Sequence, residues 1–415
     1  AVLQRHPPPH QRLSLQRTTV LVVGSGPAGA SLARRLALAG VAVILVDRLA
    51  SLSDAAFSSA ALPLADFRRL NLPAEVIGSR WSCWQLLGPA QHWRSWSSPS
   101  CLGLVLDFAS LRQWLADQVQ QLGGHVLLGW TALGSTHLPD GSMRTSFRNA
   151  HGELIEIASE WVVDATGQSR ALIGEPVIKA DPMVSGVGLE WLLKVTDVQW
   201  QRWAGRLSFL LGSEVVPQGY GWVFPMQPGL LKIGVCRLRD SRRSQPSLSS
   251  LQSHLLELTG LKQVAVLDRH GGVIRSRVSR SDPHLRGRLI ALGDAVSTAN
   301  LLGGEGIRHA IDSAEVLADV LLELQVSASA TAERAVQIQY KKYLRQKLGW
   351  RWKLSGRLGR RTWLGLKDEC SDRRLEKWLT ILENSSAEDL SALLFNYRFE
   401  RFGLKALPYL LGLRR

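Results

Sequence analysis

A glycine-rich turn near the start of the chain has the residue types and spacing that bind the phosphates of a dinucleotide. The turn consists of Gly24, Ser25, Gly26, Pro27, Ala28 and Gly29. It follows an apolar run at 20–23 and opens an Ala/Leu-rich stretch, and a second apolar run comes next, so the pattern predicts a βαβ unit. The first glycine permits a tight turn, the second lets a pyrophosphate approach the backbone, and the third allows close helix–strand packing. The helix N-terminus would face the phosphates.

The second apolar run ends in a carboxylate at the distance expected for a ribose contact. Asp47 lies 18 residues beyond Gly29, and Arg48 follows it. We expect both residues at the cofactor site, with Asp47 accepting hydrogen bonds from ribose hydroxyls. The alternative for Asp47 is a surface acid at a strand end. Turn, helix and acid together predict an adenine dinucleotide.

Two further segments resemble FAD-binding elements of glutathione-reductase-like flavoproteins. Ala165, Thr166 and Gly167 follow an apolar strand and resemble the ATG element of that group. Gly293 and Asp294 resemble its GD motif, whose aspartate binds the flavin-side ribitol. The resemblance implies that the dinucleotide is FAD, held by segments from both ends of the nucleotide-binding body. Asp294 could instead cap the segment that follows it.

The segment after this motif resembles the geranylgeranyl reductase branch of the FAD-dependent monooxygenase superfamily. The similarity covers 293–307 and ends in Gly304, Glu305, Gly306 and Ile307, which lead into a long amphipathic helix. The two glycines would let the backbone approach the isoalloxazine, and the helix N-terminus would stabilise negative charge on reduced flavin. The resemblance implies that these four residues contact the cofactor.

A second stretch matches the PxxYxWxFP signature of the same family. Its fixed residues are Pro217, Tyr220, Trp222, Phe224 and Pro225. The resemblance implies that this strand forms the substrate cavity, and Tyr220 and Trp222 alternate on one strand face, where they could line a slot for a polyprenyl chain. We expect Tyr220 to donate the proton that accompanies hydride transfer. The alternatives are that Tyr220 only shapes the pocket, or that the strand is part of the aromatic core.

One departure from the family leaves the substrate open. Where relatives often carry Cys-Gly, residues 57–63 contain no thiol. The resemblance implies reduction of a prenyl-lipid double bond. An aromatic or prenyl-quinone hydroxylase with the same motifs is the alternative, followed by a non-catalytic flavin-binding partner protein. A flavin halogenase does not fit, because it needs a lysine in the N-terminal part of the chain and Lys179 is the first. The electron donor, NADPH or a ferredoxin-type protein, stays open because no second GxGxxG marks a nicotinamide domain.

These motifs predict an α/β chain with a glutathione-reductase-like, Rossmann-type FAD-binding fold. The expected parts are a flexible arm at 1–17, a discontinuous FAD-binding domain at 18–180 and 266–330, an α+β substrate lobe at 181–265 and a basic helical segment at 331–415. The proline-containing arm has a processed targeting segment as its alternative. The four cysteines form no CxxC pair, so we expect neither a metal site nor a disulfide framework, and a cytoplasmic location.

The net charge of +15 is concentrated near the ends of the chain. Residues 331–415 contain 19 Lys/Arg and 9 Asp/Glu, so the charge lies away from the expected cleft and nucleic acid is not an expected partner. Within 340–361, nine basic residues occur without an acid. An apolar stripe recurs there every four residues and consists of Tyr340, Leu344, Leu348 and Trp352.

This basic amphipathic pattern predicts attachment to an anionic membrane surface at the cytoplasmic face. The apolar ending at 402–413 would add a second shallow contact. The alternative is that the stripe packs on the body of the protein. No apolar run is long enough to span a membrane.

Overall fold

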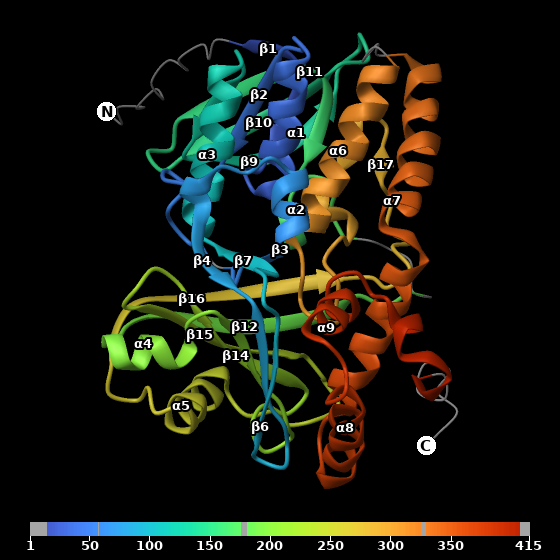
Figure 1. Ribbon diagram of the computed structural model, residues 1–415. Coiled ribbons are helices and arrows are strands. Elements are labelled where there is room, and N and C mark those ends of the chain that lie inside the picture. The colour runs from blue at the N-terminus through green and yellow to red at the C-terminus, as the bar shows by residue number, and fades with distance from the viewer. Residues whose placement is uncertain (1–14, 57, 176–180, 325–328, 407–415) are drawn as a thin grey trace, which may run out of the picture.

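The structure, a computed structural model, describes residues 15–56, 58–175, 181–324 and 329–406. An eight-stranded sheet flanked by helices forms one half, a seven-stranded sheet forms the other, and the C-terminal helices run along one side of both (Figure 1). The predicted α/β fold class with a Rossmann-type parallel core is confirmed. The first 14 residues of the predicted arm lie outside the described residues, and the first strand begins at Gln16.

The first sheet carries the predicted βαβ unit at its centre. Its strands are β1 (Gln16–Val23), β2 (Val43–Asp47), β8 (His125–Leu128), β9 (Trp130–His137), β10 (Met143–Asn149), β11 (Leu154–Asp164), β17 (Leu285–Arg286) and β18 (Leu289–Ala291). β1 lies between β11 and β2 and is parallel to both, and β18 extends the parallel order beyond β11. Because parallel strands align their carboxyl ends, the segments after β1, β11 and β18 meet at one edge.

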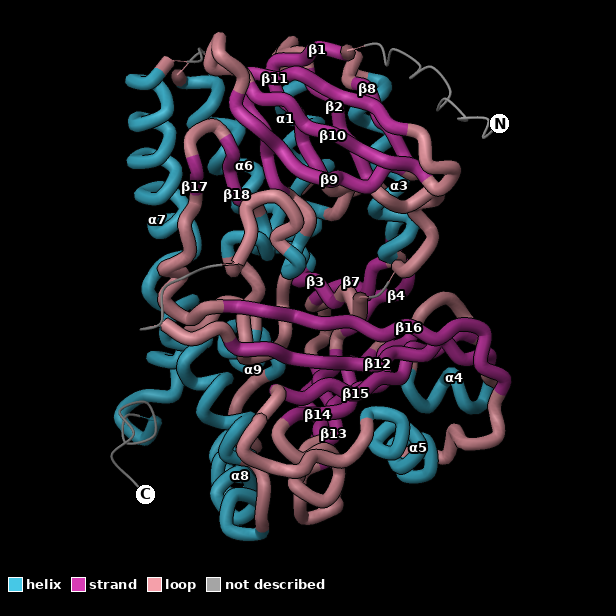
Figure 2. Tube along the Cα trace, turned by 180° about the vertical axis from the view of Figure 1, so that it is seen from behind, coloured by secondary structure: helices cyan, strands magenta, loops and turns pink. Residues whose placement is uncertain are grey.

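Helices cover one face of this sheet, with the strands in front of them in the reverse view (Figure 2). They are α1 (Pro27–Leu38), α3 (Phe108–Gln121) and α6 (Ile307–Glu323). The five residues of β2 are all buried, and α1 presents an apolar side to the sheet, including Leu32 and Leu36 at zero exposure. The nucleotide-binding half therefore owes its stability largely to buried aliphatic side chains.

The second sheet forms the opposite half. Its strands are β5 (Cys83–Leu87), β6 (Trp93–Ser97), β12 (Val184–Lys194), β13 (Arg206–Leu210), β14 (Gly219–Pro225), β15 (Leu230–Leu238) and β16 (Ala265–Ser276). Helices α4 (Asp197–Trp203) and α5 (Leu248–Leu258) accompany it. β5 pairs in parallel with β13, so residues 83–97 of the predicted FAD-binding part belong spatially to this sheet.

A small third sheet of three strands is formed by residues between β2 and α3. It consists of β3 (Ala61–Pro63), β4 (Ile77–Trp81) and β7 (Gly103–Leu106). Two short helices lie between β3 and β4 in the chain: α2 (Leu64–Arg69) and η1 (Ala74–Val76). Two more follow strands of the first sheet: η2 (Gly167–Ser169) after β11 and η3 (Gly293–Val296) after β18.

The C-terminal segment is helical and packs on the body. It contains α7 (Ala330–Gly365), α8 (Glu369–Leu382), α9 (Ala387–Leu394) and η4 (Phe399–Ala406). Gly349 interrupts α7 with φ 77° and ψ 173°, values that break helical geometry. The proposed membrane stripe, Tyr340, Leu344, Leu348 and Trp352, is buried in the core. The prediction that this stripe enters a membrane is therefore wrong, because the helix uses it to pack.

The basic face of α7 stays in solvent. Lys341, Lys342, Arg345 and Lys347 are exposed, and the Lys347 Nζ lies 3.5 Å from a Glu315 carboxylate oxygen on α6. No helix within the described residues combines the length and apolar character that a membrane crossing needs. Residues 407–413 of the apolar ending lie outside the described residues.

Candidate flavin and substrate site

The three glycines of the turn after β1 have different surroundings. A Cβ on Gly24, which has φ +107°, would lie 2.2 Å from the Ala165 carbonyl oxygen. A Cβ on Gly29 would lie 1.9 Å from the Gly24 oxygen, so both positions require glycine. A Cβ on Gly26 would meet no protein atom within 4 Å. The open space at Gly26, at the N-terminus of α1 and next to Pro27, fits a pyrophosphate that approaches the backbone.

Asp47 organises the same turn. Its Oδ2 accepts a hydrogen bond from the Ser25 N–H at 2.6 Å, and its Oδ1 accepts one from the Leu49 N–H at 2.9 Å. Each carboxylate oxygen keeps a second lone pair that could accept from a ribose hydroxyl. Arg48 is exposed beside it. Asp47 is therefore more than a surface acid, and its ribose contact stays a prediction.

The segment after β11 is held by the last residue of that strand, which belongs to the strand before the ATG element but is not one of the predicted site residues. Asp164 is completely buried, and its carboxylate accepts four hydrogen bonds, from the Thr166 N–H and hydroxyl and from the Leu172 and Ile173 N–H groups. Ala165 lies against Gly24 and Gly29. The predicted residues Ala165, Thr166 and Gly167 thus lie beside the glycine turn in a loop organised by one carboxylate.

The segment after β18 brings the third motif to the same edge. Gly293 has φ +63°, and a Cβ there would lie 2.7 Å from the Ala28 Cβ. Asp294 borders the cavity described below, and burial raises the pKa of its carboxyl group above the ordinary value. Its Oδ1 accepts a hydrogen bond from the Thr298 hydroxyl at 3.3 Å. Both readings of Asp294, as a flavin ligand and as a local cap, remain compatible with these contacts.

A cavity of about 270 Å³ lies between the nucleotide-binding segments and the second sheet. Pro27, Asp294, Gly304, Gly306 and Ile307 line it from the first side. Tyr220, Trp222, Cys236, Gly186, Gly188 and Gly272 line it from the sheet. Seven of the predicted cofactor and substrate residues, from segments far apart in sequence, therefore border one cavity, and the other predicted residues do not line it.

A smaller cavity of about 70 Å³ shares several of these walls. Phe224 and Glu305 border it together with Tyr220 and Trp222. Trp222 donates its indole N–H to the buried Glu190 carboxylate at 3.0 Å, and burial raises the pKa of that carboxyl group. A Cβ on Gly234 would lie 2.2 Å from the Trp222 ring, so the ring lies directly over β15. These contacts fix Trp222 as a wall of the site.

Tyr220 connects the second sheet to the loop that contains Gly303 and Gly304. Its hydroxyl donates a hydrogen bond to the Gly303 carbonyl oxygen at 2.8 Å, and burial raises its pKa well above the ordinary value of 10. The phenol is therefore neutral and held beside Gly304, where a Cβ would lie 3.3 Å from the hydroxyl oxygen. The arrangement fits both a proton donor and a pocket-shaping residue.

Two of the predicted substrate residues do not line the cavities, and one residue that was not predicted does. Pro217 lies in the turn before β14 and Pro225 is the last residue of that strand, and neither lines either of the two cavities. Trp363 of α7 does line the larger one, donates to the Leu302 carbonyl oxygen at 2.9 Å and packs on Tyr220 with ring centroids 4.9 Å apart. No local pattern links Trp363 to the site, because its contacts depend on the packing of α7.

Part of segment 57–63, which lacks the cysteine that relatives often carry there, also borders the site. Ser58 and Ser59 line both cavities, and Lys232 donates to the Ser58 carbonyl oxygen at 3.0 Å. Cys236 faces the larger cavity, and burial raises the pKa of its thiol to about 12. The thiol is therefore neutral and a poor nucleophile at ordinary pH.

Comparisons with known proteins agree with this geometry. The FAD binding domain family model matches residues 17–60, and FAD as cofactor is confirmed. The chain is 26% identical over 341 residues to the digeranylgeranylglycerophospholipid reductase of Haloferax volcanii, covering 76% of each. It is 29% identical over 325 residues to the menaquinone reductase of Mycobacterium tuberculosis, covering 73% of this chain and 76% of that one.

The fold also matches a solved structure. A geranylgeranyl bacteriochlorophyll reductase-like protein from Thermoplasma acidophilum superposes with a TM-score of 0.78 at 20% identity, covering 97% of this chain and all of that one. The motifs around Gly26, Asp164 and Asp294 converge on one edge of the first sheet, as an FAD fold of this type requires. The chain is an FAD-dependent oxidoreductase that is similar to geranylgeranyl reductases.

Proposed function

We propose that the enzyme reduces carbon–carbon double bonds of a prenyl-type lipid. The observation that carries the proposal is the cavity between the flavin segments and the glycine- and aromatic-lined sheet, which suits a thin apolar chain. The names of the similar reductases from Haloferax volcanii and Mycobacterium tuberculosis support a prenyl-bearing substrate. Bound FAD would supply hydride transfer to the acceptor carbon.

The chain's own residues would bind and orient both partners. Gly26 and the N-terminus of α1 would hold the pyrophosphate, Asp47 the ribose and Asp294 the ribitol. Trp222 and Phe224 would hold the prenyl chain and exclude water from the cavity. Tyr220 would hold a proton close to the acceptor carbon.

The reaction is tested by supplying reducing equivalents without oxygen. NADPH and a reduced ferredoxin would each be offered to the holoenzyme with geranylgeranyl diphosphate or menaquinone, and the products analysed by mass. We expect products that gain hydrogen, with one donor preferred. Products that appear only with oxygen and contain an added oxygen atom would favour the hydroxylase alternative.

Tyr220→Phe is expected to slow product formation at least tenfold and leave the FAD content unchanged. The substitution removes the proton but keeps the ring against Trp363, and general acid catalysis typically contributes about 10²–10⁴-fold. The measurement is kcat and KM under saturating donor, with FAD absorbance as the folding control. Unchanged turnover would eliminate the proton-donor role, and a rise in KM alone would assign Tyr220 to pocket shape.

We also propose that the enzyme works at the cytoplasmic membrane face, held by charge. Lys341, Lys342 and Arg345 form an exposed basic surface on α7. Replacing all three by Gln is expected to weaken binding to vesicles with anionic lipid at low salt by on the order of 100-fold. Each basic residue near such a surface contributes about 1 kcal/mol. Sedimentation at low and high salt measures the effect.

The control for this experiment removes equal charge elsewhere. Three exposed basic residues, Arg148, Lys194 and Arg239, lie on other parts of the surface and would also be changed to Gln. We expect the control variant to bind vesicles nearly as well as the wild type. Equal loss in both variants would mean that attachment depends only on net charge, and no binding at low salt would remove the membrane role.

A further inference from the structure

A series of buried hydrogen bonds links Glu305, in the loop before α6, to a third cavity beside that helix. The Tyr397 hydroxyl donates to Glu305 Oε2 at 3.1 Å, and His309 Nε2 lies 2.8 Å from the same hydroxyl oxygen. A hydroxyl has a single hydrogen, and that of Tyr397 goes to Glu305. His309 must therefore donate through Nε2, which leaves Nδ1 as an acceptor.

The residues at both ends of this series of hydrogen bonds, Glu305 and His309, border cavities. Glu305 lines the small cavity that Tyr220 also borders. His309 and Tyr397 line a cavity of about 370 Å³, whose border includes the exposed Trp350. His309 is only 4% exposed, and its buried Nδ1 has no hydrogen-bond partner among the described residues. The Nδ1 atom is thus an acceptor without a partner among the described residues, on a ring that borders the third cavity.

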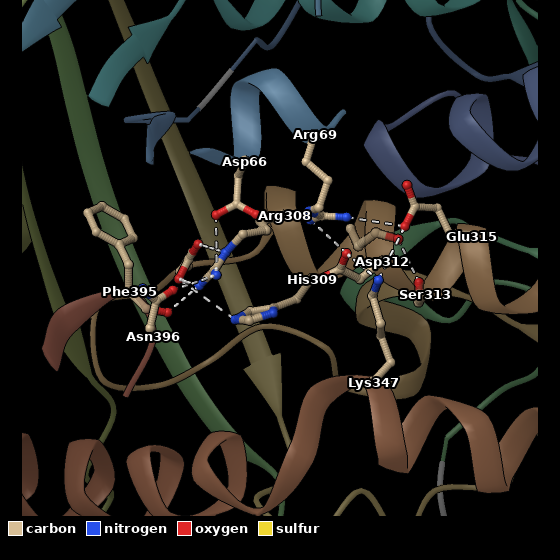
Figure 3. Close-up of polar contacts among 12 residues, drawn as sticks. Asp66, Arg69, Arg308, His309, Asp312, Ser313, Glu315, Lys347, Phe395 and Asn396 are labelled. Atoms are coloured by element: carbon tan, nitrogen blue, oxygen red, sulfur yellow. Dashed lines mark hydrogen bonds and ion pairs between the residues drawn. The ribbon is translucent and has the colours of Figure 1, made fainter. Parts of the chain in front are cut away.

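The surrounding structure holds these groups in place. Tyr397 has φ 56°, a left-handed conformation that is strained for a bulky residue and is characteristic of functional positions. Arg308 forms a bidentate pair with Glu305. It also contacts Asp66 and donates to the Phe395 carbonyl oxygen (Figure 3). Arg308 therefore fixes both the Glu305 carboxylate and the backbone next to Tyr397.

The two central groups are neutral. Burial, followed by the charge of Arg308, lowers the pKa of His309 well below 6.5. Burial, followed by the charge of Glu305, raises the pKa of Tyr397 well above 10. A neutral imidazole and a neutral phenol can each accept one proton while releasing another.

We infer that His309, Tyr397 and Glu305 form a relay that carries protons from solvent into the small cavity. The inference rests on the proposed reductase function, because reduction of a double bond consumes one proton for each hydride. In one transfer, His309 Nδ1 takes a proton from solvent and Nε2 releases its own to the Tyr397 oxygen. The Tyr397 hydroxyl proton then passes to Glu305, which releases it into the cavity. No electrons move through the relay, and rotation of the imidazole and the hydroxyl restores the starting state.

Tyr397→Phe tests the relay because it removes the hydroxyl and keeps the ring, which stacks on His309 with centroids 5.9 Å apart. Holoenzyme reduced in advance would be mixed anaerobically with geranylgeranyl diphosphate, and the return of flavin absorbance followed in H₂O and D₂O. We expect a rate at least tenfold below the wild type and a larger solvent isotope effect. A purely structural role would not raise the isotope effect.

The matched control is Tyr340→Phe, which removes a buried hydroxyl that donates to the Ala291 carbonyl oxygen at 2.9 Å, outside the relay. This control should keep the wild-type rate and isotope effect. A wild-type rate and isotope effect in Tyr397→Phe would overturn the relay. An equal loss of rate in both variants, in proportion to a loss of FAD, would also overturn it. If Tyr397→Phe does not fold, Glu305→Gln replaces it, because the amide keeps an acceptor oxygen but cannot carry the proton.

Failure of the proposed function gives a different result. Wild-type reduced enzyme would then not be reoxidised by geranylgeranyl diphosphate. The same variants would be reoxidised by dioxygen, a reaction that forms hydrogen peroxide and also takes up protons. A slower, more isotope-sensitive reaction in Tyr397→Phe alone would support the relay, and identical behaviour of the variants would reject it.

Discussion

Gly26→Trp is expected to yield folded protein that retains no FAD. The glycine lies at the N-terminus of α1, and its Cβ direction is free of protein atoms within 4 Å, so the side chain meets no obstacle from the fold. An indole there would occupy the path of the pyrophosphate and block the helix N-terminus. The flavin-to-protein absorbance ratio of the purified variant measures the loss.

The control for this variant is Gly134→Trp on β9. Gly134 is also free of neighbours within 4 Å of a Cβ, but it lies away from the flavin motifs. We expect Gly134→Trp to keep a full complement of FAD. Stoichiometric FAD in Gly26→Trp would contradict the placement of the pyrophosphate, whereas loss in both variants would indicate a general effect of adding tryptophan.

Asp164→Ala is expected to lower the free energy of unfolding by about 3 kcal/mol or more and to reduce FAD retention. The substitution removes the acceptor for four donors in the loop after β11, and each buried donor left without a partner costs about 1–3 kcal/mol. The loop that contains Thr166 then loses its fixed position beside Gly24. Chemical denaturation and FAD content measure the two effects.

The matched control is Asp140→Ala, which removes an exposed turn carboxylate that binds the Ser142 N–H and hydroxyl. Water can replace those contacts, so we expect little change in stability or in FAD content. An unfolding free energy for Asp164→Ala equal to that of the control would show that the loop does not depend on Asp164.

The cofactor half was predictable because its signals are local. Gly24, Gly26 and Gly29 carry their roles within one turn, and the structure gives a separate physical reason for each. Asp294 was predictable only through resemblance, since its position beside the cavity depends on β18 aligning with β11. Parallel strand order is a long-range property that a single motif does not contain.

The C-terminal segment was harder because one pattern serves two purposes. An apolar stripe at four-residue spacing suits a helix on a membrane and a helix on a protein core equally well. The side chains of Tyr340 and Trp352 end in polar atoms that find partners in the interior, at the Ala291 and Thr298 carbonyl oxygens. Those partners lie far away in sequence, as do the contacts of Trp363 and Tyr397 at the site.

The most direct test of the proposed double-bond reduction is a single turnover without oxygen. The purified holoenzyme would be reduced until its flavin absorbance is bleached and then mixed with geranylgeranyl diphosphate. We expect that absorbance returns and that the product gains two hydrogen atoms per flavin. Flavin that stays reduced until oxygen is admitted, with a product that contains an added oxygen atom, would contradict it.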